Sequence, residues 1–189
     1  MTPSEPPATG RADARRNREK LITAARTAFA TADAMVALET IARDAGVGIG
    51  TLYRHFPTRG ALVEAVYAAE LDEVATSAPA LLAELPPELA LRAWMDRYVA
   101  FVAAKRGMID TLRAGIASGT ISTPHTRKRL NAAIATILAA GVRTGSLRAD
   151  VDADDVTAML LGVFLSTAAT GTPDRIDALL TLVVDAVKA

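Results

Sequence analysis

Five side chains able to bind an anion lie close together between residues 51 and 59. Thr51, Tyr53 and His55 can donate hydrogen bonds, and Arg54 and Arg59 carry positive charge. Side chains of these types commonly contact the phosphate groups of nucleic acid. We therefore expect this segment, with the three residues before it, to contact double-stranded DNA. The predicted DNA-binding residues are Gly48, Ile49, Gly50, Thr51, Tyr53, Arg54, His55 and Arg59.

The start of this segment offers little for direct reading of bases. Gly48 and Gly50 have no side chains, so the backbone can approach DNA closely but reads few of its groups. Ile49 can pack on thymine methyl groups, and Arg54 can form a forked pair of hydrogen bonds with guanine. Direct readout is therefore predicted to be limited, and DNA shape is expected to supply part of the specificity.

Catalytic groups are not arranged as an enzyme would need them. The two histidines, His55 and His125, belong to different segments, and no set of Asp, Glu and His has the spacing of metal ligands. The chain has no cysteine, and no serine lies in a nucleophile motif. The segment GVGIG resembles a nucleotide-binding loop, but Tyr53 stands in place of its last glycine and no strand precedes it. We expect no enzyme activity, no cofactor and no metal.

Two short helices must position the DNA-binding residues. Apolar residues recur at helical spacing from Leu38 to Ala45, and Gly46 can adopt the left-handed conformation that ends a helix. Leu52 and Phe56, four residues apart, give a second helix its own buried side. This pattern predicts a helix-turn-helix, in which the second helix can enter the major groove.

The segment GTLYRHFPTRGALVEAV, residues 50–66, resembles the DNA-binding domain of the TetR family of bacterial transcriptional regulators. The similarity extends back through residues 18–30 and 38–48, so it covers three correctly spaced segments. The resemblance implies a dimeric, all-helical DNA-binding protein that responds to a small molecule. It also implies that Tyr53, His55 and Arg59 contact phosphates.

The connection before the helix-turn-helix departs from the family pattern. Asp33 stands where glycine is usual, and Met35 and Ala37 replace small polar residues or a Thr or Pro that would start the helix. Thr40 could supply a phosphate contact instead, but it lies inside the predicted helix. These departures weaken the expectation of a phosphate contact from the start of the first of the two helices.

Charge is distributed unevenly although the 189-residue chain has no net charge. Nine basic and five acidic residues give residues 11–60 a net charge of +4, whereas 12 basic and 15 acidic residues give residues 61–189 a net charge of −3. This asymmetry is consistent with a chain whose N-terminal part binds a polyanion and whose C-terminal part binds other partners. Uneven scatter alone would produce it about as readily.

The composition favours a helical protein without a membrane segment. Apolar residues make up 51% of the chain and aromatic residues 4%. The apolar stretches are shorter than the roughly 20 residues needed to cross a bilayer, and no leader with a cleavage site opens the chain. We expect a cytoplasmic protein with no membrane partner.

Four ranges are predicted along the chain. Residues 1–10, rich in Pro, Ser and Thr, are expected to be disordered, and residues 11–60 form the DNA-binding domain. The basic residues 11–20 could be an arm that reaches DNA or the solvated first turns of a helix. Thr58 is expected to cap a connecting helix over residues 61–78, and the proline-containing segment SAPALLAELPPE marks its end. Residues 79–189 form a ligand-binding and dimerisation domain.

This last range is predicted to hold five helices and no strand, which makes the fold all-α. They run over residues 88–106, 108–119, 123–145, from 152 or 154 to 168, and 172–187, with glycines at 107, 119 and 145 closing three of them. Thr123 and Pro124 are expected to start the third of these helices, as Thr172 and Pro173 start the last.

The last two helices are apolar around much of their circumference. The residues that surround much of the first helix are Leu160, Leu161, Val163, Phe164 and Leu165, and those that surround much of the second are Leu179, Leu180, Leu182, Val183 and Val184. Helices of this kind need burial on more than one side. We expect a homodimer formed through residues 155–168 and 173–188. The alternative is a central helix pair in the core of a monomer.

An effector pocket is expected where aromatic and methionine side chains gather. Ordinary core packing would explain any one of them, but a concave apolar site with a few polar groups is the general form of a small-molecule site. Arg97, Arg113 and His125 are candidate polar groups. Residues 105–119 and 138–156 also resemble the SbtR-like C-terminal domains of actinobacterial regulators. The predicted pocket residues are Trp94, Met95, Tyr98, Phe101, Met108, Leu112, Ile134 and Met159.

The sequence therefore predicts a ligand-responsive, DNA-binding transcriptional regulator. We expect it to be a repressor that a small lipophilic effector releases from its operator. A small-molecule-binding protein whose DNA-binding part no longer functions is the alternative, and a helical enzyme is a weaker one. Binding to DNA separates the first hypothesis from the other two.

Overall fold

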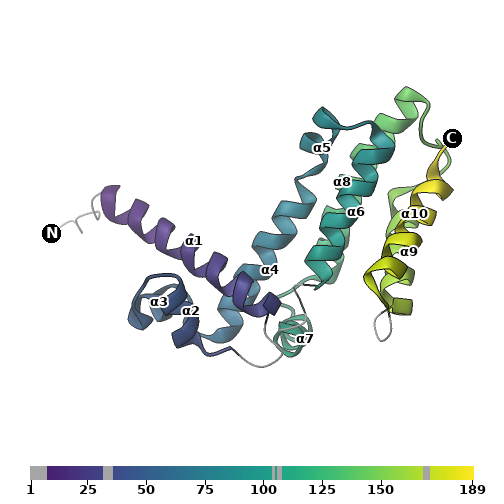
Figure 1. The fold of residues 1–189 in the computed structure, drawn as a ribbon. Helices are drawn as coiled ribbons and strands as arrows, with labels where there is room; N and C mark the ends of the chain where they lie inside the picture. The colour runs from purple at the N-terminus through teal and green to yellow at the C-terminus, as the bar shows by residue number, and fades with distance from the viewer. Residues whose placement is uncertain (1–7, 32–35, 104, 106–107, 168–170) are drawn as a thin grey trace. The chain divides into compact units, whose positions relative to one another are not determined.

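The structure is a computed structural model that describes residues 8–31, 36–103, 105, 108–167 and 171–189. Every regular element in these ranges is a helix, and an isolated bridge between Leu147 and Lys188 is the one extended pairing among them. The predicted all-α fold class is confirmed. The helices form two compact units (Figure 1).

The N-terminal unit comprises Met1–Glu70 and Val102–Ile121. In Figure 1 the long first helix lies across the two short helices that follow it, and both short helices pack against it. The unit contains α1 (Ala8–Thr31), α2 (Leu38–Asp44), α3 (Ile49–His55), most of α4 (Arg59–Ala75) and α7 (Ile109–Ser118).

The core of the N-terminal unit draws on residues far apart in the chain. One face of α1, with Leu21 and Ala25, is fully buried together with residues of α2, α3 and α4. Met108, Leu112 and Ile121 are 2%, 6% and 7% exposed in the same cluster. The segment around α7 is therefore part of the hydrophobic core beneath the predicted helix-turn-helix.

Charged side chains lie at the edge of this core. The Arg26 guanidinium of α1 lies 3.5 Å from a carboxylate oxygen of Glu70 in α4, whose side chain is only 7% exposed. The Lys105 ammonium lies 5.3 Å from the centre of the Tyr67 ring. Burial lowers the pKa of Lys105 to about 8, and attraction by Glu70 opposes that shift. The contacts connect α1, α4 and residue 105 within one unit.

The C-terminal unit comprises Leu71–Phe101 and Ser122–Ala189. The α8 and α9 helices pack on each other, as do α9 and α10 and also α5 and α8. Arg127 of α8 forms a two-pronged ion pair with Asp154 of α9, at 2.7 and 2.8 Å. The unit contains the end of α4, α5 (Ala78–Glu84), most of α6 (Pro87–Ala103), α8 (Thr123–Thr144), α9 (Ala153–Thr167) and α10 (Pro173–Val187).

The helix boundaries correct the sequence prediction in three places. Residues 8–10, predicted to be disordered, belong to α1, while residues 1–7 lie outside the described part of the chain. The segment predicted as a break forms α5, because Pro79 falls in the first turn, where a helix needs no backbone donor. The α8 helix is capped by Ser122 rather than Thr123, since the Ser122 hydroxyl accepts from the His125 amide.

The division into units also differs from the predicted domain ranges. Those ranges end at residues 10, 60 and 78, whereas the packing units separate after Glu70 and place Val102–Ile121 with the N-terminal residues. The difference arises because Met108 and Leu112 bury their side chains in the N-terminal core, a long-range contact that no local pattern indicates. The functional ranges stay predictions.

Leu112→Ala is expected to destabilise the N-terminal unit by about 2–5 kcal/mol, because it leaves a cavity in the core. Hydrogen exchange of α1 and α2 amides measures this loss locally. Ile116 lies on the same helix but is 46% exposed, so Ile116→Ala should change stability by less than about 0.5 kcal/mol. Unchanged protection in Leu112→Ala would contradict the shared core.

Candidate nucleic-acid interface

A tight turn joins α2 to α3. Gly46 has a φ of 67°, the left-handed conformation expected for the glycine that ends a helix. The Val47 amide donates to the Ala42 carbonyl at 3.0 Å, which closes the turn. Gly48 is the N-cap of α3, in extended conformation and without a side-chain cap. The predicted helix-turn-helix is present with its predicted glycines.

The α3 helix is anchored along one side and open along the other. Leu52 is fully buried and Phe56 is 2% exposed in the core of the N-terminal unit. Ile49 and Tyr53, one turn apart, are 37% and 46% exposed, and Arg54 is also exposed. The side facing solvent therefore presents groups of the types predicted to read bases or contact phosphate.

Thr51 and His55 lie at the margin of that exposed side. Both are half-buried, and the centres of the His55 and Phe56 rings are 6.3 Å apart. A Cβ added at Gly48 or Gly50 would meet no described atom within 4 Å, so packing within the unit does not require glycine there. Both positions are exposed, leaving the backbone open to a partner.

Arg59 makes intramolecular contacts that sequence reasoning missed. Its guanidinium donates to the Val36 carbonyl at 2.5 Å and stacks 5.1 Å above the centre of the Phe29 ring. Burial lowers the pKa of the Arg59 guanidinium below its usual range. Thr58 accepts from the Ala61 amide at 3.1 Å, in keeping with the predicted cap at the start of α4. Arg59 thus connects α4 to α1 and to the residues before α2, whatever else it binds.

The start of α2 offers no side-chain cap. Ala37 is its N-cap residue and makes no side-chain hydrogen bond, and Thr40 lies inside the helix, half-buried. Asp33 and Met35, the other two departures from the family pattern, lie outside the described residues.

The predicted effector residues fall into both units. Trp94, Met95, Tyr98 and Phe101 are buried on α6 of the C-terminal unit, which also contains the buried Ile134 and the half-buried Met159. Met108 and Leu112 belong instead to the core of the N-terminal unit.

The aromatic residues of α6 form a continuous stack. The Trp94 and Tyr98 rings are nearly parallel, with centres 5.8 Å apart, and the Trp94 indole donates to the Val74 carbonyl at 3.0 Å. Phe164 of α9, which the sequence prediction did not include, meets the Tyr98 ring edge-on at 5.3 Å. Its position on the apolar face of α9 was the available signal.

The three candidate polar groups lie on the surface. Arg97 and His125 are exposed in the C-terminal unit, and the His125 position agrees with a first-turn residue facing solvent. Arg113 is exposed in the N-terminal unit and lies 3.6 Å from Asp110.

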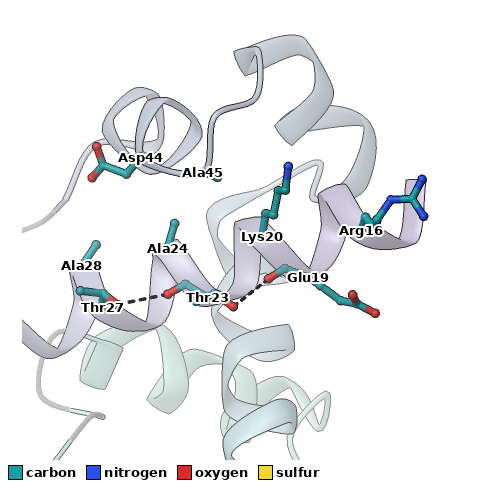
Figure 2. A pocket seen from close by; sticks show the side chains of 9 residues that line it. All are labelled: Arg16, Glu19, Lys20, Thr23, Ala24, Thr27, Ala28, Asp44 and Ala45. Carbon is teal, nitrogen blue, oxygen red and sulfur yellow. Dashed lines mark hydrogen bonds between the residues drawn. The ribbon is translucent and has the colours of Figure 1, made fainter. Parts of the chain in front are cut away.

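An open groove lies between α1 and the end of α2 (Figure 2). Two basic side chains, Arg16 and Lys20, are balanced there by Glu19 and Asp44, so the groove is not a positively charged surface. None of the predicted effector residues lines it. The lining residues are Arg16, Glu19, Lys20, Thr23, Ala24, Thr27, Ala28, Asp44 and Ala45.

The described ranges contain neither a metal-ligand cluster nor a helix that could span a membrane. Among those residues, no three His, Cys, Asp or Glu side chains are grouped as metal ligands would be. No helix in the described ranges combines the length and apolar character needed to cross a bilayer.

Comparison with known proteins agrees with this geometry. Residues 21–66 match the profile of bacterial regulatory proteins of the tetR family, and residues 86–189 match the SbtR-like transcriptional regulator C-terminal domain. No curated protein matches the chain in sequence.

Solved structures show similarity over nearly the whole chain. A TetR transcriptional regulator of Streptomyces coelicolor is 42% identical, with a TM-score of 0.78 over 90% of this chain and 98% of its own. A TetR regulatory protein of Mycobacterium vanbaalenii is 33% identical, with a TM-score of 0.72 over 95% and 99%. A transcriptional regulator of Cytophaga hutchinsonii, 17% identical over 90% and 98%, shares the fold with a TM-score of 0.67.

The two profiles cover the helix-turn-helix and the helical part that follows it, and two solved regulators exceed 30% identity across both. Members of this family are DNA-binding transcription factors rather than enzymes. The chain belongs to the TetR family of bacterial transcriptional regulators.

Proposed function

We propose that this regulator is a repressor that binds its operator as a homodimer and leaves it when a small lipophilic effector binds. The observation that carries the proposal is the open side of α3, where Ile49, Tyr53 and Arg54 are exposed opposite a fully buried Leu52. A helix anchored in this way can enter a major groove without losing its core contacts. Such a repressor would act in the cytoplasm, where the chromosome lies.

The residues of α3 divide into two proposed roles. Arg54 and Ile49 read base edges, because a guanidinium can fork onto guanine and an apolar side chain can cover a thymine methyl. Tyr53, Thr51 and His55 contact phosphates, which position the protein without reading sequence directly. Gly48 and Gly50 allow the backbone to come close to the duplex. Arg59, also assigned to phosphate, has a second role in holding the unit together.

Sequencing of the genomic DNA fragments retained by the purified protein would test the proposal and identify the operator. On that operator, Arg54→Ala should cost about 1–3 kcal/mol and relax the choice of one base pair, with little loss on scrambled DNA. Tyr53→Phe removes only the hydroxyl, and should weaken operator and scrambled DNA by similar factors. Isotherms for both duplexes over a salt series measure the difference.

The reverse pattern, with Arg54→Ala weakening both duplexes equally, would show that the roles are assigned wrongly. Arg59→Ala is a poor probe of phosphate binding alone, because it also removes the contacts with Val36 and Phe29. A thermal melt of each variant separates loss of fold from loss of a DNA contact.

Exposed leucines support dimerisation through the last two helices. Leu161 and Leu165 of α9, one turn apart, are 39% and 79% exposed, and Leu182 of α10 is 62% exposed. Grouped apolar side chains facing water mark protein interfaces more often than free surface. The proposed interface spans residues 155–168 and 173–188, of which residue 168 lies outside the described ranges.

Leu165→Glu is expected to convert the dimer to a monomer, because a carboxylate would lose its water on association. Operator affinity should fall with it, since two half-sites then need two separate binding events. Leu89→Glu is the matched control, because Leu89 is 54% exposed on α6, outside the proposed interface. Sedimentation at micromolar concentration decides the point: a wild-type monomer, or a dimer that survives Leu165→Glu, would refute the interface.

The effector is proposed to bind beside the aromatic stack of α6. Trp94, Met95 and Ile134 are 1% exposed or less, so a ligand would have to displace or separate packed side chains. Met159 of α9 is half-buried and offers an edge at which this could begin. Met108 and Leu112, the other predicted contacts, keep that role only as predictions, because both also serve the N-terminal core.

A lipophilic compound that releases the operator should change the emission of Trp94, the chain's one tryptophan. Tyr98→Leu removes the stacked ring and should raise the concentration needed for release several-fold, whereas Leu89→Ala should not. Fluorescence titration and operator release measured on the same samples provide the comparison. Release at the wild-type concentration in Tyr98→Leu, with no change in wild-type emission, would place the pocket elsewhere.

A further inference from the structure

Three described glycines lie inside a helix, beyond its first turn: Gly115 of α7, Gly141 of α8 and Gly162 of α9. Glycine at such a position weakens a helix relative to alanine, so packing must compensate for it. A Cβ at Gly115 would lie 2.8 Å from the Ile121 side chain, and one at Gly141 would lie 2.3 Å from that of Leu147. At these two positions a side chain of the same chain packs directly on the helix backbone.

Gly162 has no such neighbour among the described residues. A Cβ built there would meet no described atom within 4 Å, and the residue is exposed. The surface around it is apolar, because Ala158 is exposed and Leu161 and Leu165 are 39% and 79% exposed. Residues 158–167 include no charged side chain. This surface is suited to close approach by an apolar side chain from outside the chain.

The exposed residues of α9 form a hollow with the spacing used in helix packing. Residues three and four apart are neighbours on a helix, so Ala158, Leu161, Gly162 and Leu165 mark the corners of a diamond on its surface. Four residues of this kind form the hole that receives one side chain of a facing helix. Glycine and alanine keep the floor of this α9 hollow close to the backbone, and the leucines form its walls. Its shape and character suit one aliphatic side chain.

The neighbouring helix carries a projecting side chain of that kind. The α9 and α10 helices pack side by side in the C-terminal unit (Figure 1). Leu182 of α10 is 62% exposed, and the exposed residues four positions before and after it are Ala178 and Ala186. It therefore stands above its surroundings. Leu182 does not fill the hollow of its own chain, because no described atom lies within 4 Å of a Cβ at Gly162.

We propose that the α9 hollow receives Leu182 of a second copy of this chain, and that two such insertions fix how the copies dock. The inference rests on the proposed homodimer through α9 and α10 and names the contact that sets its register. A twofold interface uses every contact twice, so a hollow and a projecting leucine on one chain are enough to match both copies. Residues 178–184 are also uncharged, so association removes no charged group of either segment from water.

Single cysteines test this contact without interference, because the chain has no cysteine of its own. Chains with Gly162→Cys and Leu182→Cys, co-expressed with different affinity tags and purified as the mixed dimer, should form an intermolecular disulfide on mild oxidation. The bond needs Cα atoms about 4.4–6.8 Å apart, so it reports this pairing specifically. Gly162→Cys mixed with Leu89→Cys is the matched control, which should stay unlinked because Leu89 is exposed on α6, outside the proposed interface.

An exchange of side-chain sizes gives a second readout, which misfolding does not imitate. Gly162→Leu fills the hollow and should weaken dimerisation about tenfold or more by overpacking, although leucine is the better helix former within one chain. Adding Leu182→Ala removes the side chain that then clashes, so the double variant should dimerise about threefold or more tightly than Gly162→Leu alone. Sedimentation over a concentration series measures both changes.

The outcomes separate this inference from the proposed homodimer. If the wild type dimerises, the absence of the mixed disulfide, or a double variant no tighter than Gly162→Leu, would refute the insertion alone. A disulfide that forms equally well between two Gly162→Cys chains would show that the hollow meets its own symmetry mate, and would also overturn the pairing with Leu182. A wild-type monomer would refute both the insertion and the homodimer.

Discussion

The helix that presents the DNA-binding residues has only seven residues, so it depends on burial for its existence. Isolated helices shorter than about 12–15 residues are marginal in water. Leu52 and Phe56 hold α3 because both are buried in the N-terminal core. The same two side chains set the rotation of the helix, and successive residues of a helix point about 100° apart. Because Leu52 points into the core, Arg54, two residues later and about 200° around the helix, faces solvent.

That core extends well beyond the helix-turn-helix. Met108, Leu112 and Ile121 belong to the cluster that anchors α3, and Lys105 lies beside Tyr67 near the ion pair of Arg26 and Glu70. Packed interiors transmit displacement because they contain little free space. A ligand that displaced residues 102–121 would therefore act on the packing that orients the DNA-reading side chains. Within the N-terminal unit, the segment around α7 is thus connected to α3 through packed side chains of one core.

Arginine has several distinct uses in this unit. Arg59 is drawn inward by the Val36 carbonyl and the Phe29 ring, whereas Arg54 projects into solvent from α3. Arg18 combines the two, with one face on the Phe56 ring and an exposed edge. A guanidinium permits all three because its flat faces stack while its rim donates hydrogen bonds. Residue type alone therefore does not distinguish an anchor from a DNA contact.

The sequence by itself determined the local features: the all-α fold, the turn at Gly46, the cap at Gly48 and the buried side of α3. Each rests on spacing or backbone conformation within a few residues. Tertiary structure alone decided that α7 joins the N-terminal core, that Arg59 turns inward, and that Phe164 meets Tyr98. These contacts join residues separated by 23 to more than 60 positions. Periodicity shows which face of a helix is buried, but the partner of that face depends on how the whole chain packs.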